Sequence, residues 1–231
     1  MFNLYDFINS ESENININSN QITLYHGSKS GINGLITPSS REKCDFGKGF
    51  YMGTQPEQPL TLICDFPNSK FYIMTLDLSE LNVLDISPNL EWALLVAFHR
   101  GKMDKIKGTA LYNKYQNISK SHDLIVGNIA NDRMFYVLDN FFLGNITDTA
   151  LIKSLSALQL GKQYVCITQK ACDAVKIEKE ISISDTDRLF LQQISAENRM
   201  HGVSLANDIC RNYRREGLYF DEILENAQKE G

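Results

Sequence analysis

The stretch Cys44-Asp45-Phe46-Gly47-Lys48-Gly49-Phe50-Tyr51-Met52-Gly53-Thr54 decides how this chain is organised. Gly47 and Gly49 flank a lysine and allow backbone angles and close approaches that a Cβ atom would forbid. The aromatic pair Phe50 and Tyr51 then favours an extended, half-buried backbone. The stretch therefore predicts a flexible turn that delivers a tyrosine from a strand edge, where a flat ligand can stack on the phenol ring.

Two shorter segments have a related character. Residues 24–28 read Leu-Tyr-His-Gly-Ser and predict a strand that ends in a histidine and a glycine. Residues 161–165 read Gly-Lys-Gln-Tyr-Val and predict a turn that leads a polar side chain into another strand. Taken alone, a histidine at a strand end is usually structural, and a Gly-x-Gly turn before aromatic residues is usually an ordinary hairpin. Only the order of the three segments therefore points to a function.

Length and composition set the limits on the class of protein. The chain has 231 residues and a net charge of −5, with 43% hydrophobic and 22% charged residues. These values are typical of a globular protein with one large domain, or one domain with an appendage. The charge balance gives no basic footprint for nucleic acid over the whole chain.

The cysteines and histidines indicate neither a disulfide framework nor a metal site. The cysteine number is odd, no Cys-x-x-Cys pair occurs, and the four histidines are scattered. The start of the chain lacks a signal-peptide pattern, and no apolar run approaches a membrane span of about 20 residues. We therefore expect a reduced, cytoplasmic protein with no membrane contact and no metal.

Apolar periodicity predicts most elements. Strands are expected at 22–26, 71–78, 83–86, 123–126, 163–168 and 176–183. Helices are expected at 55–65, from a Ser87 cap with Pro88 in the first turn to Gly101, after the polar turn 128–132, from a Thr147 cap to Gly161, and at 171–175.

Three further segments lie between or after these elements. Residues 27–48 form a long loop, a kind of segment that is often functional. Residues 102–121 are polar and carry Tyr112 and Tyr115, which suits either a substrate-facing surface or, as we favour, a solvated loop. From residue 185 onward the pattern predicts two or three helices, broken at Gly202 and Gly217.

The three segments, with a fourth at 123–132, resemble His-Tyr-Glu ADP-ribosyltransferases, the branch of diphtheria toxin and the poly(ADP-ribose) polymerases. They are more similar to a bacterial family of ADP-ribosyltransferase-fold proteins that includes toxins of toxin–antitoxin systems. That family shows Tyr-His-Gly-Ser, Asp-Phe-Gly-Lys-Gly-Phe-Tyr, Asp-hydrophobic-Ile-Val-Gly-x-x-Ala-Asn/Asp-Asp and Leu-Gly-x-Gln blocks. The corresponding residues here are 25–28, 45–51, 123–132 and 160–163, and the resemblance covers roughly residues 21 to 180.

The resemblance implies an architecture and an activity. The implied fold is α+β, with an ADP-ribosyltransferase-like split β-sheet around an NAD cleft and added C-terminal helices. Residues 1–20 would form an N-terminal arm, 21–183 the ADP-ribosyltransferase-like domain, and 184–231 a helical extension. The implied activity is NAD-dependent transfer of ADP-ribose to a protein or nucleic acid, as a toxin or defence protein that an antitoxin can cover.

The resemblance also implies roles for individual residues. His26 would hold a ribose of NAD, the Gly27 backbone would meet the nicotinamide amide, and Tyr51 would stack on the nicotinamide ring. Ser28 would bond a ribose hydroxyl or cap a turn, and Lys48 would lie near the pyrophosphate or point to solvent. The other cofactor-binding positions implied by the loop are Gly47, Gly49 and Phe50.

Gln163 departs from the broad superfamily, in which a glutamate at this position binds the 2′-hydroxyl of the nicotinamide ribose. A carboxamide exchanges hydrogen bonds but carries no charge and cannot act as a general base. Either the acceptor is intrinsically nucleophilic, or another carboxylate acts as base, with Asp132 preferred over Asp45 and Asp123. An N-cap role for Asp132 is the competing interpretation. The alternatives to transfer are NAD hydrolysis and a weakened module that only binds NAD or ADP-ribose.

Overall fold

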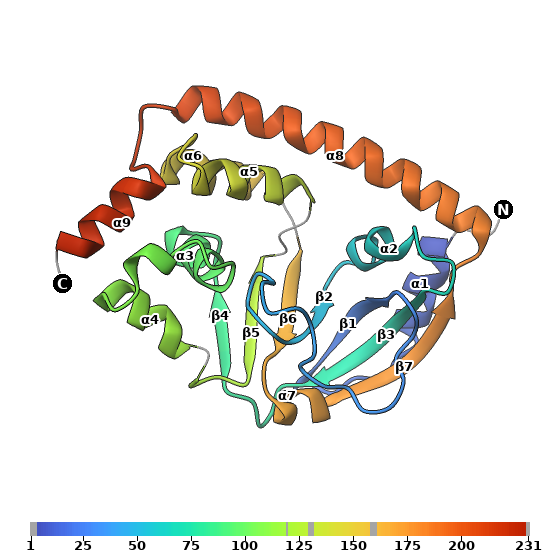
Figure 1. The fold of residues 1–231 in the computed structure, drawn as a ribbon. Helices are drawn as coiled ribbons and strands as arrows, with labels where there is room; N and C mark the ends of the chain where they lie inside the picture. The colour runs from blue at the N-terminus through green and yellow to red at the C-terminus, as the bar shows by residue number, and fades with distance from the viewer. Residues whose placement is uncertain (1–3, 119, 129–131, 158–160, 230–231) are drawn as a thin grey trace.

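The computed structural model of the protein describes residues 4–118, 120–128, 132–157 and 161–229. These residues form a mixed α+β fold around one seven-stranded sheet of order β4-β5-β6-β2-β1-β3-β7 (Figure 1). Only β4 and β5 pair in parallel, so the predicted α+β class is confirmed. The strands are β1 (Gln21–Ser28), β2 (Phe50–Gly53), β3 (Lys70–Asp77), β4 (Val83–Ile86), β5 (Leu124–Asn128), β6 (Lys162–Cys166) and β7 (Val175–Ser182).

The helices surround this sheet and continue beyond its last strand. The described helices are α1 (Leu4–Glu13), α2 (Glu57–Ile63), α3 (Leu90–His99), the 3-10 helix η1 (Asp104–Ile106), α4 (Ala110–Ile118), α5 (Asp132–Phe142), α6 (Asp148–Ala157), α7 (Gln169–Asp173), α8 (Asp185–Tyr213) and α9 (Phe220–Lys229).

The sheet has two differently covered faces, because successive side chains of a strand point to opposite sides. The face that carries Tyr51 and Val165 packs on α3 to α6 and α9, and on α1, α2 and α8 at the other end of the sheet; we call it the helical face. The opposite face carries Phe50 and Met52 and packs on α7 and on Ile32 of the β1–β2 loop; we call it the loop face.

The strand pairing divides the sheet into two halves. β1 pairs with β3 along its whole length, from Gln21 to Ser28, and β2 pairs with β6 along all four of its residues. Between β1 and β2 the ladder consists of the single pair Tyr25↔Gly53. The β4-β5-β6-β2 half and the β1-β3-β7 half therefore meet at their weakest pairing.

The long helix α8 spans both halves. It packs against α2 near its start and against α5 and α6 further along, and it runs along one side of the molecule in Figure 1. Leu191 is fully buried in a cluster with Leu4 and Ile8 of α1 and Phe71 of β3. Helix packing therefore supplies the connection between the halves that the β1–β2 ladder lacks.

Local structure differs from the sequence-based expectation in three places. Helix α3 begins after Asn89, whose side chain accepts a hydrogen bond from Trp92 N, so the predicted Ser87 cap is wrong. Residues 104–118 are mostly helical and bury Tyr115 completely, so this segment is not a solvated loop. Helix α8 is continuous from Asp185 to Tyr213, so the break predicted at position 202 is wrong; the helix as a whole contacts α2, α5 and α6. The predicted Thr147 cap of α6 is confirmed, since its hydroxyl accepts from Ala150 N at 3.3 Å.

The packing of α8 leads to a stability prediction. Leu191→Ala should lower the free energy of unfolding by about 2–4 kcal/mol, because it removes a fully buried side chain and leaves a cavity. Leu189→Ala is the matched control two positions away, since 69% of Leu189 is exposed, and it should change stability by less than about 0.5 kcal/mol. Urea denaturation measures both. Equal effects would show that α8 does not pack on this half of the sheet as described.

Candidate functional site

His26 lies on β1 at the junction of the two halves of the sheet. Its Nδ1–H donates to the carbonyl oxygen of Tyr51 at 2.7 Å, and its ring lies against Phe50 with 4.4 Å between centroids. A carbonyl only accepts, so the proton resides on Nδ1 and Nε2 is left as an acceptor. Burial lowers the pKa of His26, while the hydrogen bond to the Tyr51 backbone acts in the opposite direction. The side chain is therefore a neutral imidazole that replaces a missing ladder hydrogen bond.

Tyr51 is the next residue of the junction, on β2. Its hydroxyl donates to Gly47 O at 2.7 Å and accepts from Phe46 N at 3.1 Å. Burial raises the pKa of the Tyr51 phenol well above its usual value, so the hydroxyl keeps its proton. The side chain is half-buried on the helical face, and its hydroxyl closes the glycine-containing turn back onto the strand that follows it.

Gln163 lies on β6 and is 95% buried. Its Nε2 donates to the carbonyl oxygen of Asn128 at 3.0 Å. The residues beside it in register are Gly53 of β2 and Gly127 of β5, and the Phe46 ring of the loop lies over Gly127. By strand alternation Gln163 shares the helical face with Tyr51, two positions along the ladder.

The glycines of the site allow close contacts between segments. Gly47 has φ +76°, and a Cβ there would lie 2.6 Å from His99 Nδ1. A Cβ on Gly49 would lie 2.5 Å from Val165 Cγ1, and one on Gly27 would lie 2.6 Å from the backbone oxygen of Pro59. The loop therefore approaches β6 and α3, and β1 approaches α2, at distances that only glycine permits.

The buried ion pair between Asp45 and Arg100 joins the loop to the end of α3. Arg100 donates to Asp45 Oδ1 from Nε at 3.1 Å and from Nη2 at 2.6 Å, and both side chains are about nine-tenths buried. Burial raises the pKa of the Asp45 carboxyl, and the charge and hydrogen bonds of Arg100 act in the opposite direction. Sequence reasoning missed Arg100, although a His-Arg pair at the end of an otherwise apolar helix was a usable signal.

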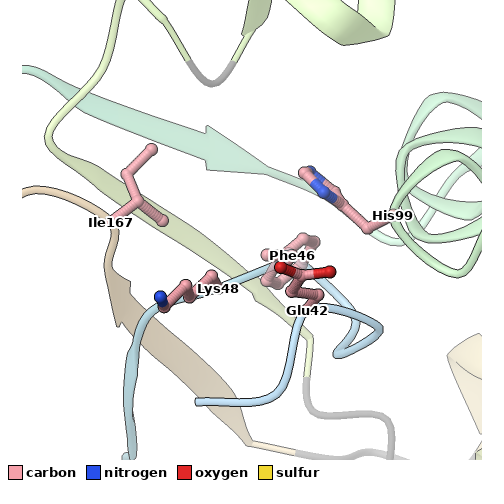
Figure 2. A pocket seen from close by; sticks show the side chains of 6 residues that line it. Glu42, Phe46, Lys48, His99 and Ile167 are labelled. Carbon is pink, nitrogen blue, oxygen red and sulfur yellow. The ribbon is translucent and has the colours of Figure 1, made fainter. Parts of the chain in front are cut away.

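A small pocket opens beside this ion pair. Its volume is about 220 Å³, and Figure 2 shows His99 reaching from α3 toward the loop, with Ile167 across the pocket. Burial lowers the pKa of His99 to about 4, so the pocket presents a neutral imidazole near neutral pH. The pocket is lined by Glu42, Phe46, Gly47, Lys48, His99 and Ile167.

The remaining cofactor-binding candidates occupy two different environments. Phe50 is buried against His26 on the loop face, and the Ser28 hydroxyl donates to Gly31 O at 2.9 Å, which makes it a turn cap. Lys48 is exposed at the mouth of the pocket.

The candidate bases lie apart from one another. Asp45 is beside Gln163, whereas Asp123 lies at the opposite end of β5 and accepts from Thr168 and Asn82. Helix α5 begins at Asp132, whose side chain lies outside the described residues.

The structure brings His26, Tyr51 and Gln163 onto β1, β2 and β6, which are consecutive in the sheet. Tyr51 and Gln163 share the helical face, while the imidazole of His26 lies with Phe50 on the loop face. The imidazole therefore reaches the backbone of Tyr51 and does not face its ring. A ligand that touches all three groups has to lie across the β1–β2 junction.

In the ranges that the structure describes, no three His, Cys, Asp or Glu side chains converge into a group that can hold a metal ion. None of the described helices combines the length and the apolar character that a membrane crossing needs.

Comparison with known proteins places the chain in a family. The model of a family of proteins of unknown function, DUF3990, matches residues 22–177, well over half of the chain. The protein therefore belongs to the DUF3990 family. No curated protein and no solved structure matches the chain significantly.

Removal of the Tyr51 hydroxyl tests its role in holding the loop. Tyr51→Phe should lower the free energy of unfolding by about 1–3 kcal/mol, because it leaves the Phe46 N–H without its acceptor and the Gly47 carbonyl with only the longer bond from Ser40 Oγ at 3.4 Å. Tyr112→Phe is the matched control, since none of the described residues hydrogen bonds to that hydroxyl. Thermal denaturation at neutral pH compares the two. A Tyr51→Phe effect no larger than the control would contradict this role.

The environment of His99 predicts a dependence of stability on pH. Its folded pKa of about 4 lies below the ordinary value of 6.5, so the unfolded chain binds more protons between these values. The contribution of His99 to the free energy of unfolding is therefore fully present above pH 6.5. This contribution, about 3 kcal/mol at most, is lost as the pH falls toward 4. His99→Gln should lose less stability over that window than wild type. His26 contributes equally to both proteins, so the difference isolates His99, and parallel curves would refute the assignment.

Proposed function

We propose that this protein is an NAD-dependent ADP-ribosyltransferase that modifies an intracellular macromolecule. The observation that carries the proposal is the placement of His26, Tyr51 and Gln163 on three consecutive strands, next to a junction held by one ladder pair. The resemblance of residues 25–28, 45–51 and 160–163 to ADP-ribosyltransferase blocks supports the same conclusion. The proposed fold is accordingly a split ADP-ribosyltransferase-like sheet.

The protein does not need to supply a strong nucleophile for this reaction. The bond between the nicotinamide nitrogen and the ribose C1′ breaks, and nicotinamide leaves with the electron pair. The acceptor then bonds to C1′ and releases its proton to solvent, through a transition state that resembles an oxocarbenium ion. The protein therefore has to hold the dinucleotide in a strained, oriented form and to position the acceptor.

The neutral side chains of the junction suit that task. With Nδ1 bonded to the Tyr51 carbonyl, His26 Nε2 accepts a hydrogen bond from a ribose hydroxyl. The Tyr51 ring, held by its own hydroxyl, offers a fixed surface on which the nicotinamide stacks. Lys48, exposed at the pocket mouth, is placed to approach a phosphate of the dinucleotide. The toxin role, with an antitoxin as partner, belongs to the same proposal and rests on the resemblance alone.

Labelled NAD incubated with the full chain and a bacterial lysate tests the proposal. Wild type should transfer label to protein or nucleic acid, and His26→Ala or Tyr51→Ala should lower the transfer by about 100-fold or more, because each removes a group that orients NAD. His122→Gln is the control, since His122 bonds to Ile118 O at the far end of β5. Its transfer should remain near wild type.

The same assay separates the alternatives. Free ADP-ribose without labelled macromolecule would select NAD hydrolysis, and calorimetric binding of NAD without turnover would select a binding module. A wild-type protein that neither binds NAD nor turns it over would contradict the proposal. Growth arrest on expression, relieved by Tyr51→Ala, would be the expected result for a toxin.

A further inference from the structure

The turn between Ser40 and Gly49 is a closed, positively charged part of the β1–β2 loop. Ser40 N donates to Gly49 O at 3.1 Å, and Gly49 N donates back to Ser40 Oγ at 3.0 Å. Three exposed cations lie between these two ends: Arg41, Lys43 and Lys48. The hydrogen bonds therefore close the turn and keep the three cations on one short segment.

These three cations have no acidic partner within the part of the chain that the structure describes. Other surface lysines do, since Lys114 and Lys162 each pair with a carboxylate. The turn carries one exposed carboxylate, Glu42, so its exposed side chains sum to +2, from three cations and one anion, in a chain whose net charge is −5. A positive segment of this kind in an acidic protein indicates an anionic ligand.

The pocket beside this turn is too small for a dinucleotide. Its volume is about 220 Å³, below the range of about 300–1,000 Å³ that is typical of sites for whole small-molecule ligands. Phe46 and Ile167 give it apolar walls, and His99 adds a neutral imidazole. Figure 2 shows the Glu42 carboxylate beside Phe46, on the same turn as Lys48. The pocket therefore suits one small, uncharged group that carries a hydrogen-bond donor for Glu42.

The charge pattern distinguishes between kinds of ligand. An acidic side chain of a peptide would be attracted by the cations but repelled by Glu42 at the pocket, and a basic side chain would be repelled by the cations. A nucleotide of a single strand satisfies both, because its phosphates are anionic and its base is neutral. Adenine, guanine and cytosine also carry an exocyclic amino group, which donates to a carboxylate. The pattern therefore favours single-stranded nucleic acid.

The turn also connects this pocket to the surface on which the nicotinamide is proposed to stack. The Tyr51 hydroxyl donates to Gly47 O at 2.7 Å and accepts from Phe46 N at 3.1 Å, and both of these residues line the pocket. The Tyr51 side chain and the pocket wall thus belong to one hydrogen-bonded unit. A base in the pocket would therefore lie next to the place of the proposed reaction.

We propose that residues 41–48 and their pocket bind single-stranded nucleic acid, with an amino-bearing base in the pocket and the flanking phosphates on Arg41 and Lys43. This strand is the macromolecule that the enzyme modifies, with Lys48 left for a phosphate of the dinucleotide. The role of the strand as acceptor rests on the proposed function, whereas its binding does not require NAD.

Binding is measured by fluorescence anisotropy of labelled single strands of DNA and of RNA, about 12 nucleotides long, with the full chain and without NAD. Arg41→Gln/Lys43→Gln should lower the steepness of log K against log salt concentration by about 1.4, because each phosphate contact to a single strand contributes about 0.7. Arg214→Gln/Arg215→Gln is the matched control, with the same change of charge at two exposed arginines after α8. Its salt dependence should equal that of wild type.

The pocket is tested by comparing an all-cytosine with an all-thymine DNA strand at neutral pH. Wild type should bind the cytosine strand roughly fivefold or more tightly, because cytosine offers an amino group to Glu42 and thymine does not. Glu42→Gln should lose most of this preference, because a carboxamide donates as well as accepts. Glu225→Gln, at an exposed glutamate of α9, should keep it. Equal binding of the two strands by wild type would overturn the placement of the base.

The failure of this inference and the failure of the proposed function give different results. Absence of NAD turnover in wild type would end the proposed function, while the anisotropy would still decide whether the turn binds a strand. No binding of either strand at low salt, or an equal loss of salt dependence in the two double variants, would overturn the inference. So would tighter binding of poly-glutamate than of both strands. Transfer of label from NAD to protein alone would refute the role of the strand as acceptor.

Discussion

The buried ion pair between Arg100 and Asp45 is the interaction on which the rest of the site depends. It joins the end of α3 to the loop that precedes β2, and the loop in turn packs Phe46 over Gly127 and Gly47 against His99. Removing one partner of such a pair leaves an uncompensated charge away from water, at a cost of about 3–5 kcal/mol. The loop, the strand and the helix end are therefore held together by electrostatics as well as by packing.

The second constraint is the weak junction in the middle of the sheet. A single ladder pair between β1 and β2 leaves backbone groups that need other partners, and the His26 imidazole supplies one for the Tyr51 carbonyl. The halves stay together because α8 packs on helices of both, through α2 on one side and α5 and α6 on the other. The fold thus keeps polar groups at a junction without letting the halves separate.

Local patterns in the sequence predicted the elements whose signals are local. The strand at 83–86 appears with its predicted bounds, and the Thr147 cap follows from its own side chain. The Asn89 cap was missed because a plausible Ser-Pro signal lies two residues earlier. The burial of Tyr115 was missed because the segment around it is rich in polar residues and lysines. The glycine at 202 does not end α8: a helical glycine costs roughly 1 kcal/mol, and the helix as a whole contacts α2, α5 and α6.

The candidate site was predictable in its residues and not in its geometry. The three motifs identified His26, Tyr51 and Gln163, but pairing of Asp45 with Arg100 joins residues 55 positions apart, which no local pattern shows. The register that puts Tyr51 and Gln163 on one face and the His26 ring on the other depends on which strands are neighbours. Strand order is a property of the whole fold, so the sequence alone could not specify it.

A crystal structure with carba-NAD, an analogue whose nicotinamide ribose carries carbon in place of the ring oxygen, tests the central claim most directly. The claim is that a dinucleotide lies across the β1–β2 junction, in contact with both faces of the sheet. We predict the nicotinamide ring on Tyr51, a ribose hydroxyl at His26 Nε2 and the nicotinamide ribose beside Gln163. An analogue bound elsewhere, or a junction unchanged at saturating analogue, would contradict the account.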